Sequence, residues 1–232
     1  MTAATEPGSP SVADETRSLL LAIRLRAAAG SDVLAEVLRG LSLQVADVAT
    51  LAGRLELAGL VEHRDGSFPG WRLTDDGRAE GERLLALELE QLGVRAAVTH
   101  AYDRFVQRNS DLLHVCTDWQ LLDATPSAPV VNDHTDADHD RRVIERLGVV
   151  HQRVLPICVD LSACIDRFGA YGPRFTHAHE RVVAGQVEAI DSPDTDSFHT
   201  IWFELHEHLL ATVGRDRSTE PLPAPYRPPA SS

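Results

Sequence analysis

The sequence predicts a mainly α-helical protein in two parts: three helices followed by a two-stranded β-hairpin, and then a larger all-helical domain. Three observations support this prediction. Apolar residues recur at helical spacing along most of the chain. The spacing becomes strand-like near residue 60, and a dense group of turn-forming residues, DGSFPG at 65–70, divides that stretch in two. The length of 232 residues is sufficient for two domains with separate cores.

The first three helices are expected between residues 16 and 58. Gly30 and Gly40 end the first and the second, because glycine adopts the left-handed backbone found after many helices. Ser42 is expected to cap the third helix, which runs to Ala58. The two strands and the long helix after them are expected at 60–64, 71–74 and 76–92.

Six further helices are expected in the second part, with a proline-containing loop at 122–132 between the second and the third. Their approximate ranges are 94–108, 110–116, 135–147, 149–168, 173–189 and 196–213. The predicted domains are therefore 16–92 and 93–217. The ends at 1–15 and 218–232, rich in Pro, Ser and Ala, are expected to be disordered tails.

The chain is acidic: 22 basic residues against 35 Asp and Glu give a formal charge of −13. Every basic residue is Arg. A protein that binds DNA needs a basic face, because phosphate contacts supply most of the non-specific affinity. Any contact with DNA must therefore come from the local placement of arginines, and not from the overall field of the protein.

The three cysteines, Cys116, Cys158 and Cys164, are an odd number without the spacing of a metal site, and they predict buried thiols in a reducing cytoplasm. No run of 18 apolar residues occurs, so no membrane span is expected. The first residues lack the basic and apolar regions of a secretory signal. We expect a cytoplasmic protein without a cofactor.

The segment LSLQVADVATLAGRLELAGLVEHRDGSFPGWRLTDDGR (41–78) resembles winged helix-turn-helix regulators of the MarR and PadR type. The stretch AGLVEHR, a turn-rich wing and WRLTDDGR, which is similar to the common LT..G helix start, lie in the order found in that family. In this fold the third helix enters the major groove and the wing touches the backbone or minor groove. The resemblance implies a DNA-binding face made of Gln44, Thr50, Arg54, Arg64 and Arg72.

Two acidic residues on the same segment, Asp47 and Glu56, oppose DNA binding. The alternative is that this module makes only protein contacts, either with a partner protein or in a dimer. The acidic balance of the chain favours that alternative.

Polar residues gather in four segments of the second part: HVCTDWQLLD (114–123), NDHTDADHD (132–140), YGPRFTHAHERV (171–182) and DSFHTIWFELHEHLL (196–210). Polar groups so near Trp and Phe are costly to bury unless they are paired or used, so together they predict an internal pocket for a small ligand. The candidate ligand-binding residues are Asp118, Trp119, Asn132, His134, His139, Tyr171, Arg174, His199, Trp202 and His206.

Some of these residues also fit a metal site. His134, Asp136, His139, His199 and His206 supply the nitrogen and oxygen ligands that divalent metals accept. The run 132–140 is equally typical of a capped helix start, with Thr135 and Asp138 at the spacing of a capping box. A zinc-protease motif is absent, because Leu210 stands where H-E-x-x-H needs its second histidine.

A second resemblance covers nearly all of 93–217. The run CTDWQ, NDHTDADHD and SFHTIWFELHEHLL is similar to a helical region of GC-rich bacterial proteins. There the region accompanies a winged helix alone, or forms part of proteins related to phosphoenolpyruvate-utilising enzymes. The resemblance implies a regulatory or ligand-sensing part. The chain lacks the phosphohistidine and nucleotide-binding domains of those enzymes, so no phosphotransfer is expected.

These observations favour a one-component transcription regulator that binds DNA as a homodimer and senses a small ligand in its helical domain. The first alternative is an accessory protein whose winged helix binds another protein. A metal-dependent enzyme is the least favoured class, because no complete catalytic or metal motif is present.

Overall fold

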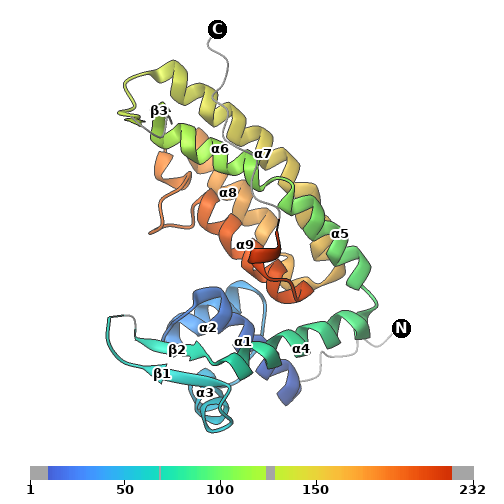
Figure 1. Ribbon diagram of the computed structural model, residues 1–232. Coiled ribbons are helices and arrows are strands. Elements are labelled where there is room, and N and C mark those ends of the chain that lie inside the picture. Colours follow the sequence, from blue (N-terminus) through green and yellow to red (C-terminus); the bar gives the residue numbers. More distant parts are fainter. Residues whose placement is uncertain (1–9, 68, 124–128, 221–232) are drawn as a thin grey trace, which may run out of the picture. The chain divides into compact units, whose positions relative to one another are not determined.

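The computed structural model describes residues 10–67, 69–123 and 129–220, and it is mainly helical (Figure 1). The chain divides into two compact units. The first comprises Met1–Gly93 with Leu210–Arg215, and the second comprises Val94–Leu209 with Asp216–Ser232. The division at Gly93 lies next to the boundary expected after residue 92.

The first unit begins with two helices, α1 (Val12–Arg26) and α2 (Ser31–Gly40). A capping box starts α1: the Ser11 hydroxyl accepts from the Asp14 backbone, and the Asp14 carboxylate accepts from the Ser11 backbone. The prediction of a disordered tail up to residue 15 is therefore wrong for residues 12–15, because this local cap extends the helix toward the N-terminus. The tail before residue 10 lies outside the described residues.

The third helix, α3 (Val48–Leu57), begins later than the sequence indicated. Ser42 is not its cap, since Ser42 has a φ of 56° and follows the end of α2. The cap is Asp47, whose carboxylate accepts from the Thr50 backbone at 2.9 Å and from the Thr50 hydroxyl at 2.7 Å. The chain before it is held elsewhere, because the Ala46 N–H donates to Glu15 at 2.8 Å.

An antiparallel hairpin of β1 (Val61–Arg64) and β2 (Gly70–Leu73) follows α3, close to the predicted strands. The register pairs Val61 with Leu73 and Arg64 with Gly70. A further bridge joins Ala29, between α1 and α2, to Trp71, with N–H···O distances of 2.9 and 3.3 Å. The hairpin is thus fixed to the start of the unit as well as to α3.

The turn into α4 (Asp75–Leu92) explains the LTDDG stretch of the sequence. Thr74 caps α4 by accepting from the Gly77 N–H at 3.0 Å, and its hydroxyl donates to the Gly59 carbonyl at 2.7 Å. A Cβ atom on Gly77 would lie 1.7 Å from the Leu60 carbonyl oxygen. Only glycine therefore allows α4 to start this close to the turn that ends α3.

The helices of the second unit are α5 (Arg95–Val106), α6 (Asn109–Gln120), α7 (Ala137–Cys164), α8 (Tyr171–Val183) and α9 (Phe198–Val213), with short 3-10 turns at Asp166–Phe168, Val187–Ala189 and Arg217–Thr219. The helices predicted at 135–147 and 149–168 are one continuous helix, α7, with Pro156 inside it. Gly148 does not interrupt α7, and its missing side chain leaves room for the His179 ring of α8.

The prediction of an all-helical second domain needs one correction. Residues Leu121–Asp123 (β3) and Val130–Val131 (β4) form a short antiparallel pair where a loop at 122–132 was expected. The middle of that loop lies outside the described residues. Strand pairing of so few residues has no hydrophobic alternation from which it could be predicted.

The core of the second unit forms where α7 packs against α5, α6 and α8. The buried face of α7 includes Val143, Leu147, Val150, Val154 and Leu161. Among the described residues α7 is the one helix whose length and mean hydropathy of 1.2 would permit it to cross a membrane. By itself this is weak support for a membrane span, because a core helix passes the same test and a third of the stretch, 33%, is buried.

The expected disorder from residue 218 is wrong for the residues that the structure describes. Asp216 caps the turn at Arg217–Thr219, and the Glu220 side chain is buried against α5 and α9. Residues 221–232, the remainder of the predicted tail, lie outside the described residues.

Candidate ligand cavity in the second unit

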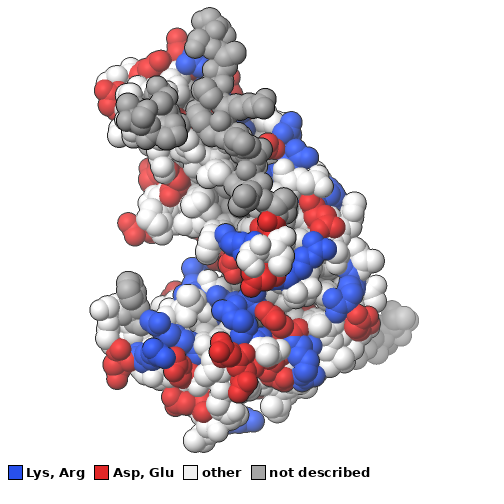
Figure 2. Space-filling model, viewed as in Figure 1, with Lys and Arg blue, Asp and Glu red and all other residues white. Residues whose placement is uncertain are grey.

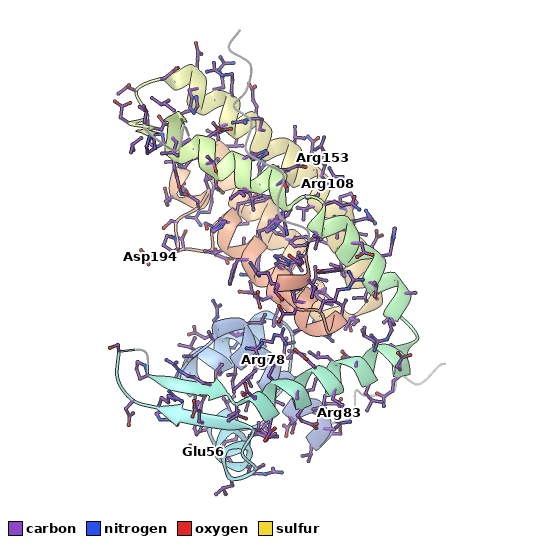
Figure 3. All side chains as sticks on the ribbon, in the orientation of Figure 1. Glu56, Arg78, Arg83, Arg108, Arg153 and Asp194 are labelled. Atoms are coloured by element: carbon purple, nitrogen blue, oxygen red, sulfur yellow. The ribbon has the colours of Figure 1, made fainter. Side chains whose placement is uncertain are left out.

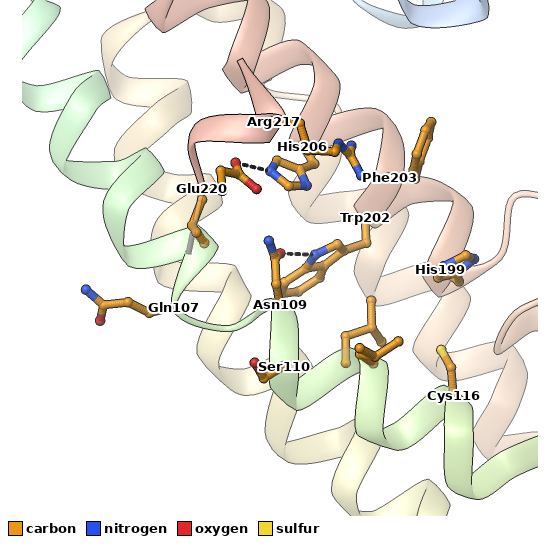
Figure 4. Close-up of a pocket in the computed structure, with 13 residues that line it drawn as sticks. Gln107, Asn109, Ser110, Cys116, His199, Trp202, Phe203, His206, Arg217 and Glu220 are labelled. Carbon is orange, nitrogen blue, oxygen red and sulfur yellow. Dashed lines mark hydrogen bonds and ion pairs between the residues drawn. The ribbon is translucent and has the colours of Figure 1, made fainter. Parts of the chain in front are cut away.

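A cavity of about 440 Å³ lies between the junction of α5 with α6, helix α9 and the segment Arg217–Glu220 (Figure 4). Three of the predicted ligand residues line it: His199, Trp202 and His206. They come from successive turns of α9, so helical spacing places them on one side of that helix.

The wall of the cavity is aromatic. Trp202 is buried and stacks on Phe105 with 4.4 Å between ring centroids. The Trp202 indole N–H donates to the Asn109 side-chain oxygen at 2.9 Å, which satisfies its buried polar atom and fixes the ring plane. Figure 4 shows the indole lying across the middle of the cavity. Such a wall suits the flat face of an aromatic or other planar apolar group.

One end of the cavity holds a buried carboxylate, Glu220. Its Oε1 atom accepts from the Tyr102 hydroxyl and from His206 Nε2, each at 2.6 Å. His206 therefore carries a proton on Nε2, and its ring edge rests on Phe105 with 5.6 Å between centroids. These groups give an otherwise apolar cavity a polar end with fixed hydrogen-bonding directions.

The remaining lining residues argue against a covalent reaction at this cavity. Burial, with a smaller effect of Asp191, raises the pKa of the Cys116 thiol to about 12, so the thiol stays protonated and is a poor nucleophile. Arg217 lies over the Phe203 ring at 5.0 Å and pairs with Glu207 at 2.5 Å. The cavity is thus built for binding.

Tyr171 and Arg174, also predicted to bind the ligand, instead belong to a buried network between α8 and α9. Arg174 donates to Glu204 at 2.6 Å and to both oxygens of Asp196, at 2.6 and 3.1 Å. The Tyr171 hydroxyl donates to Glu204 at 3.3 Å. All the ligand-type donors of Tyr171 and much of the Arg174 fork therefore serve the packing of the two helices.

His208, which the sequence did not single out, completes this network. The Arg167 Nε–H donates to His208 Nε2 at 2.9 Å, so the neutral ring carries its proton on Nδ1 and donates it to the Tyr171 oxygen at 3.0 Å. Burial, followed by the charge of Arg167, lowers the pKa of His208 well below its ordinary value. Burial and then Glu204 raise the pKa of Tyr171 well above its ordinary value. Both groups are neutral near pH 7.

Trp119 and His134 line a different hollow of about 490 Å³ beside α7 and α8. Their rings lie 4.3 Å apart, and the His134 Nδ1 atom lies 3.1 Å from Asp140. Asn132 is buried and donates to the Trp119 carbonyl at 3.0 Å and to Asp140 at 2.9 Å. His134 has a φ of 58°, a conformation that is rare outside glycine. The predicted single pocket is therefore at least two separate hollows.

Asp118 and His139 connect α6 to α7. The buried Asp118 carboxylate pairs with Arg146, and the His139 Nε2 atom contacts the Asp118 carbonyl at 2.7 Å. Asp136 caps α7 by accepting from the backbones of Asp138 and His139, each at 3.0 Å. The run 132–140 thus forms a helix start, with Asp136 as the cap in place of the expected Thr135.

The five proposed metal ligands do not gather: His134 lies in one hollow, His199 and His206 line another, and Asp136 and His139 serve the start of α7. Over residues 10–67, 69–123 and 129–220 no group of three or more His, Cys, Asp or Glu side chains is placed to hold a metal ion. The structure gives no support to the metal-dependent alternative.

The residues predicted to contact DNA lie in different settings within the first unit. Thr50 and Arg54 are exposed on α3, and Gln44 is exposed in the segment before α3. The Thr50 hydroxyl is used by Asp47, and Arg64 on β1 pairs with Glu62 at 2.6 Å. Arg72 on β2 is half-buried. Among these five, Arg54 is the cation most clearly presented to solvent.

The sequence reasoning missed Phe105, Asn109, Tyr102 and Glu220 at the cavity. Phe105 follows helical spacing with Tyr102 and would have been placed in a core, but nothing local links Asn109 to Trp202. Comparisons of the chain with protein-family models, with curated proteins and with solved structures found no match. Its function must therefore be argued from its own fold and surfaces.

Proposed function

We propose that this chain is a one-component transcription regulator whose first unit is a winged helix that binds DNA and whose second unit binds a small effector. The order α1, α2, α3, β1, β2, α4 matches the winged-helix layout, and the Ala29–Trp71 bridge adds the short strand contact that such a hairpin makes with the segment after the first helix. This arrangement is the observation that carries the proposal.

DNA reading would depend on α3 and on a few arginines. Arg54 is exposed on α3, and its guanidinium suits the base edges of guanine or a phosphate. Glu56 on the same helix accepts from the His63 backbone at 3.2 Å, which directs this carboxylate toward the wing. Asp47 places a negative charge at the start of α3, where a phosphate would otherwise be favoured. Affinity would therefore be modest and sensitive to salt.

The effector would occupy the cavity at α9. Its aromatic wall at Trp202 and its polar end at His206 and Glu220 suit a planar, mostly apolar molecule with one or two hydrogen-bonding groups. Binding would control DNA affinity if the effector favoured one of two arrangements of a homodimer. The protein would act in the cytoplasm.

Selection from a random pool of duplex DNA tests the proposal. We expect the full chain to enrich a sequence, with two half-sites related by a dyad if it binds as a dimer. Arg54→Ala should lose the enrichment. Arg83→Ala removes an equal charge from α4, where Arg83 is held by Glu80 at 2.7 Å, and it should keep the enrichment. No enrichment by the native protein would refute the proposal.

A second function has its own support. The first 93 residues contain nine Arg against fifteen Asp and Glu, a net charge of −6, and such a surface repels DNA while it tolerates a protein partner. In that case the first unit would bind another protein. Recovery of one stable partner together with no selected DNA sequence would favour this function over the first.

A further inference from the structure

Three arginines of the second unit line one hollow of about 390 Å³. Arg104 lies near the end of α5, Arg108 precedes α6, and Arg153 lies on α7. The other lining residues are Gln107 and Ile157. Figure 3 labels Arg108 and Arg153 as neighbours, and Figure 2 shows basic atoms at that place on the same face. Helices distant in sequence bring these residues together, so no local motif announced them.

The hollow has an excess of positive charge. Arg108 and Arg153 share one carboxylate, Asp111, at 3.3 and 3.1 Å, and Arg104 pairs with Asp160. Three guanidinium groups thus face two carboxylates, which leaves a net charge of +1 in a strongly acidic protein. Neither carboxylate is among the residues that line the hollow, so its surface presents cations and one neutral amide.

The guanidinium groups also keep hydrogen-bonding capacity. Each of these arginines makes its ion pair through a single terminal nitrogen, NH1. By contrast, Arg174 in the buried network uses Nε, NH1 and NH2 against its two carboxylates. A guanidinium has five N–H donors, so most donors at the hollow remain for a ligand or for water.

The start of α6 adds to the attraction for an anion. Arg108 is the residue before this helix of 12 residues, and no side chain caps its first turn. The first N–H groups of a helix carry the positive end of its dipole, and phosphates bind readily there. The hollow therefore combines two independent sources of positive potential, side-chain charge and a helix start.

We propose that this hollow binds the phosphoryl group of a small phosphorylated metabolite. Arginine forks match the geometry of phosphate oxygens, the Gln107 amide supplies a further donor, and Ile157 offers an apolar contact for the organic part. The volume suits a small ester. The site is distinct from the aromatic cavity and does not depend on DNA binding by the first unit. A nucleic-acid phosphate has the same chemistry, and the experiment separates the two sources.

Calorimetric titration of the full chain tests the site, with glycerol 3-phosphate and pyrophosphate as probes at constant ionic strength. We expect saturable binding that weakens at least tenfold in Arg153→Gln. Arg153 is exposed, so this substitution should leave the fold intact, which circular dichroism would verify. Arg141→Gln is the matched control on α7: Arg141 is also exposed and paired, with Asp138 at 2.7 Å, but lies outside the hollow. It should bind both probes normally.

Three results would overturn the proposal. The first is no saturable binding of either probe by the native protein. The second is equal affinity in Arg153→Gln and the native protein. The third is a loss of duplex DNA binding in Arg153→Gln when neither small probe binds, which would assign the arginines to a nucleic-acid backbone.

Discussion

The two units secure their helices in different ways. In the first unit, helix starts are fixed by side chains three residues apart, such as Asp47 with Thr50 and Thr74 with Gly77. In the second unit, the informative polar contacts join distant residues: Trp202 meets Asn109 across 93 positions, and Tyr102 meets Glu220 across 118. Local sequence therefore describes the first unit well, and the functional surfaces of the second depend on long-range packing.

The largest expected effect concerns the aromatic core behind the cavity. Phe105 is fully buried and stacks on Trp202. Phe105→Ala should lower the free energy of unfolding by about 3–5 kcal/mol, the usual cost of deleting a buried aromatic side chain. Phe203→Ala, at a side chain that is 50% exposed, should cost less than about 1 kcal/mol. Urea unfolding measures both, and equal losses would contradict the assignment of Phe105 to the core.

A slightly smaller effect is expected from backbone packing in the first unit. Gly77→Ala places a Cβ atom against the Leu60 carbonyl, which cannot swing aside as a side chain can, and should cost about 3 kcal/mol. Gly53→Ala is the control, because a Cβ at that position of α3 meets no atom within 4 Å. It should stabilise the helix by about 0.5–1 kcal/mol. Substitutions of the same sign would show that the α4 start is misplaced.

The buried network of the second unit predicts a dependence on pH. The folded-state pKa of His208 lies well below its ordinary value of 6.5, so below about pH 6.5 the unfolded chain binds the extra proton. Stability should therefore be highest above this pH and fall as the pH decreases, by up to about 1.4 kcal/mol per unit for one histidine. His151 and His179, whose pKa values are also lowered, chiefly by burial, act in the same direction.

A non-titrating variant isolates the contribution of His208. His208→Gln should be less stable than the native protein at pH 7.5, because the Arg167 and Tyr171 contacts are disturbed. Its urea midpoint should nevertheless fall less between pH 7.5 and 5.5. An unchanged slope would show that His208 is not the buried neutral group that the network requires.

The start of α3 illustrates what sequence could and could not predict. Ser42 and Asp47 are both good caps, and the choice between them depends on the ending of α2 and on the bond from Ala46 to Glu15, 31 residues away. The Asp47–Thr50 pair was visible locally and would have given the right start. The hairpin and its order after three helices were predictable because turn formers and strand-like residues alternate over a short range.

The candidate sites were harder to predict for a physical reason. His134, Trp119, Trp202 and His206 were expected to share one pocket, and the structure separates them into two hollows. Residue type shows that a polar group needs a partner, but tertiary packing decides which partner it meets. Glu220 was lost in a proline-rich end whose composition predicts disorder, although its carboxylate is held by Tyr102 and His206.

The most direct test of the central claim is fluorescence anisotropy with the duplex enriched by the native protein. If α3 reads DNA, Arg54→Ala should weaken binding about 5- to 150-fold, which corresponds to about 1–3 kcal/mol for one base contact. Arg83→Ala should change the affinity less than about twofold at the same salt concentration. Equal affinities of the native protein and Arg54→Ala would contradict DNA reading by this helix.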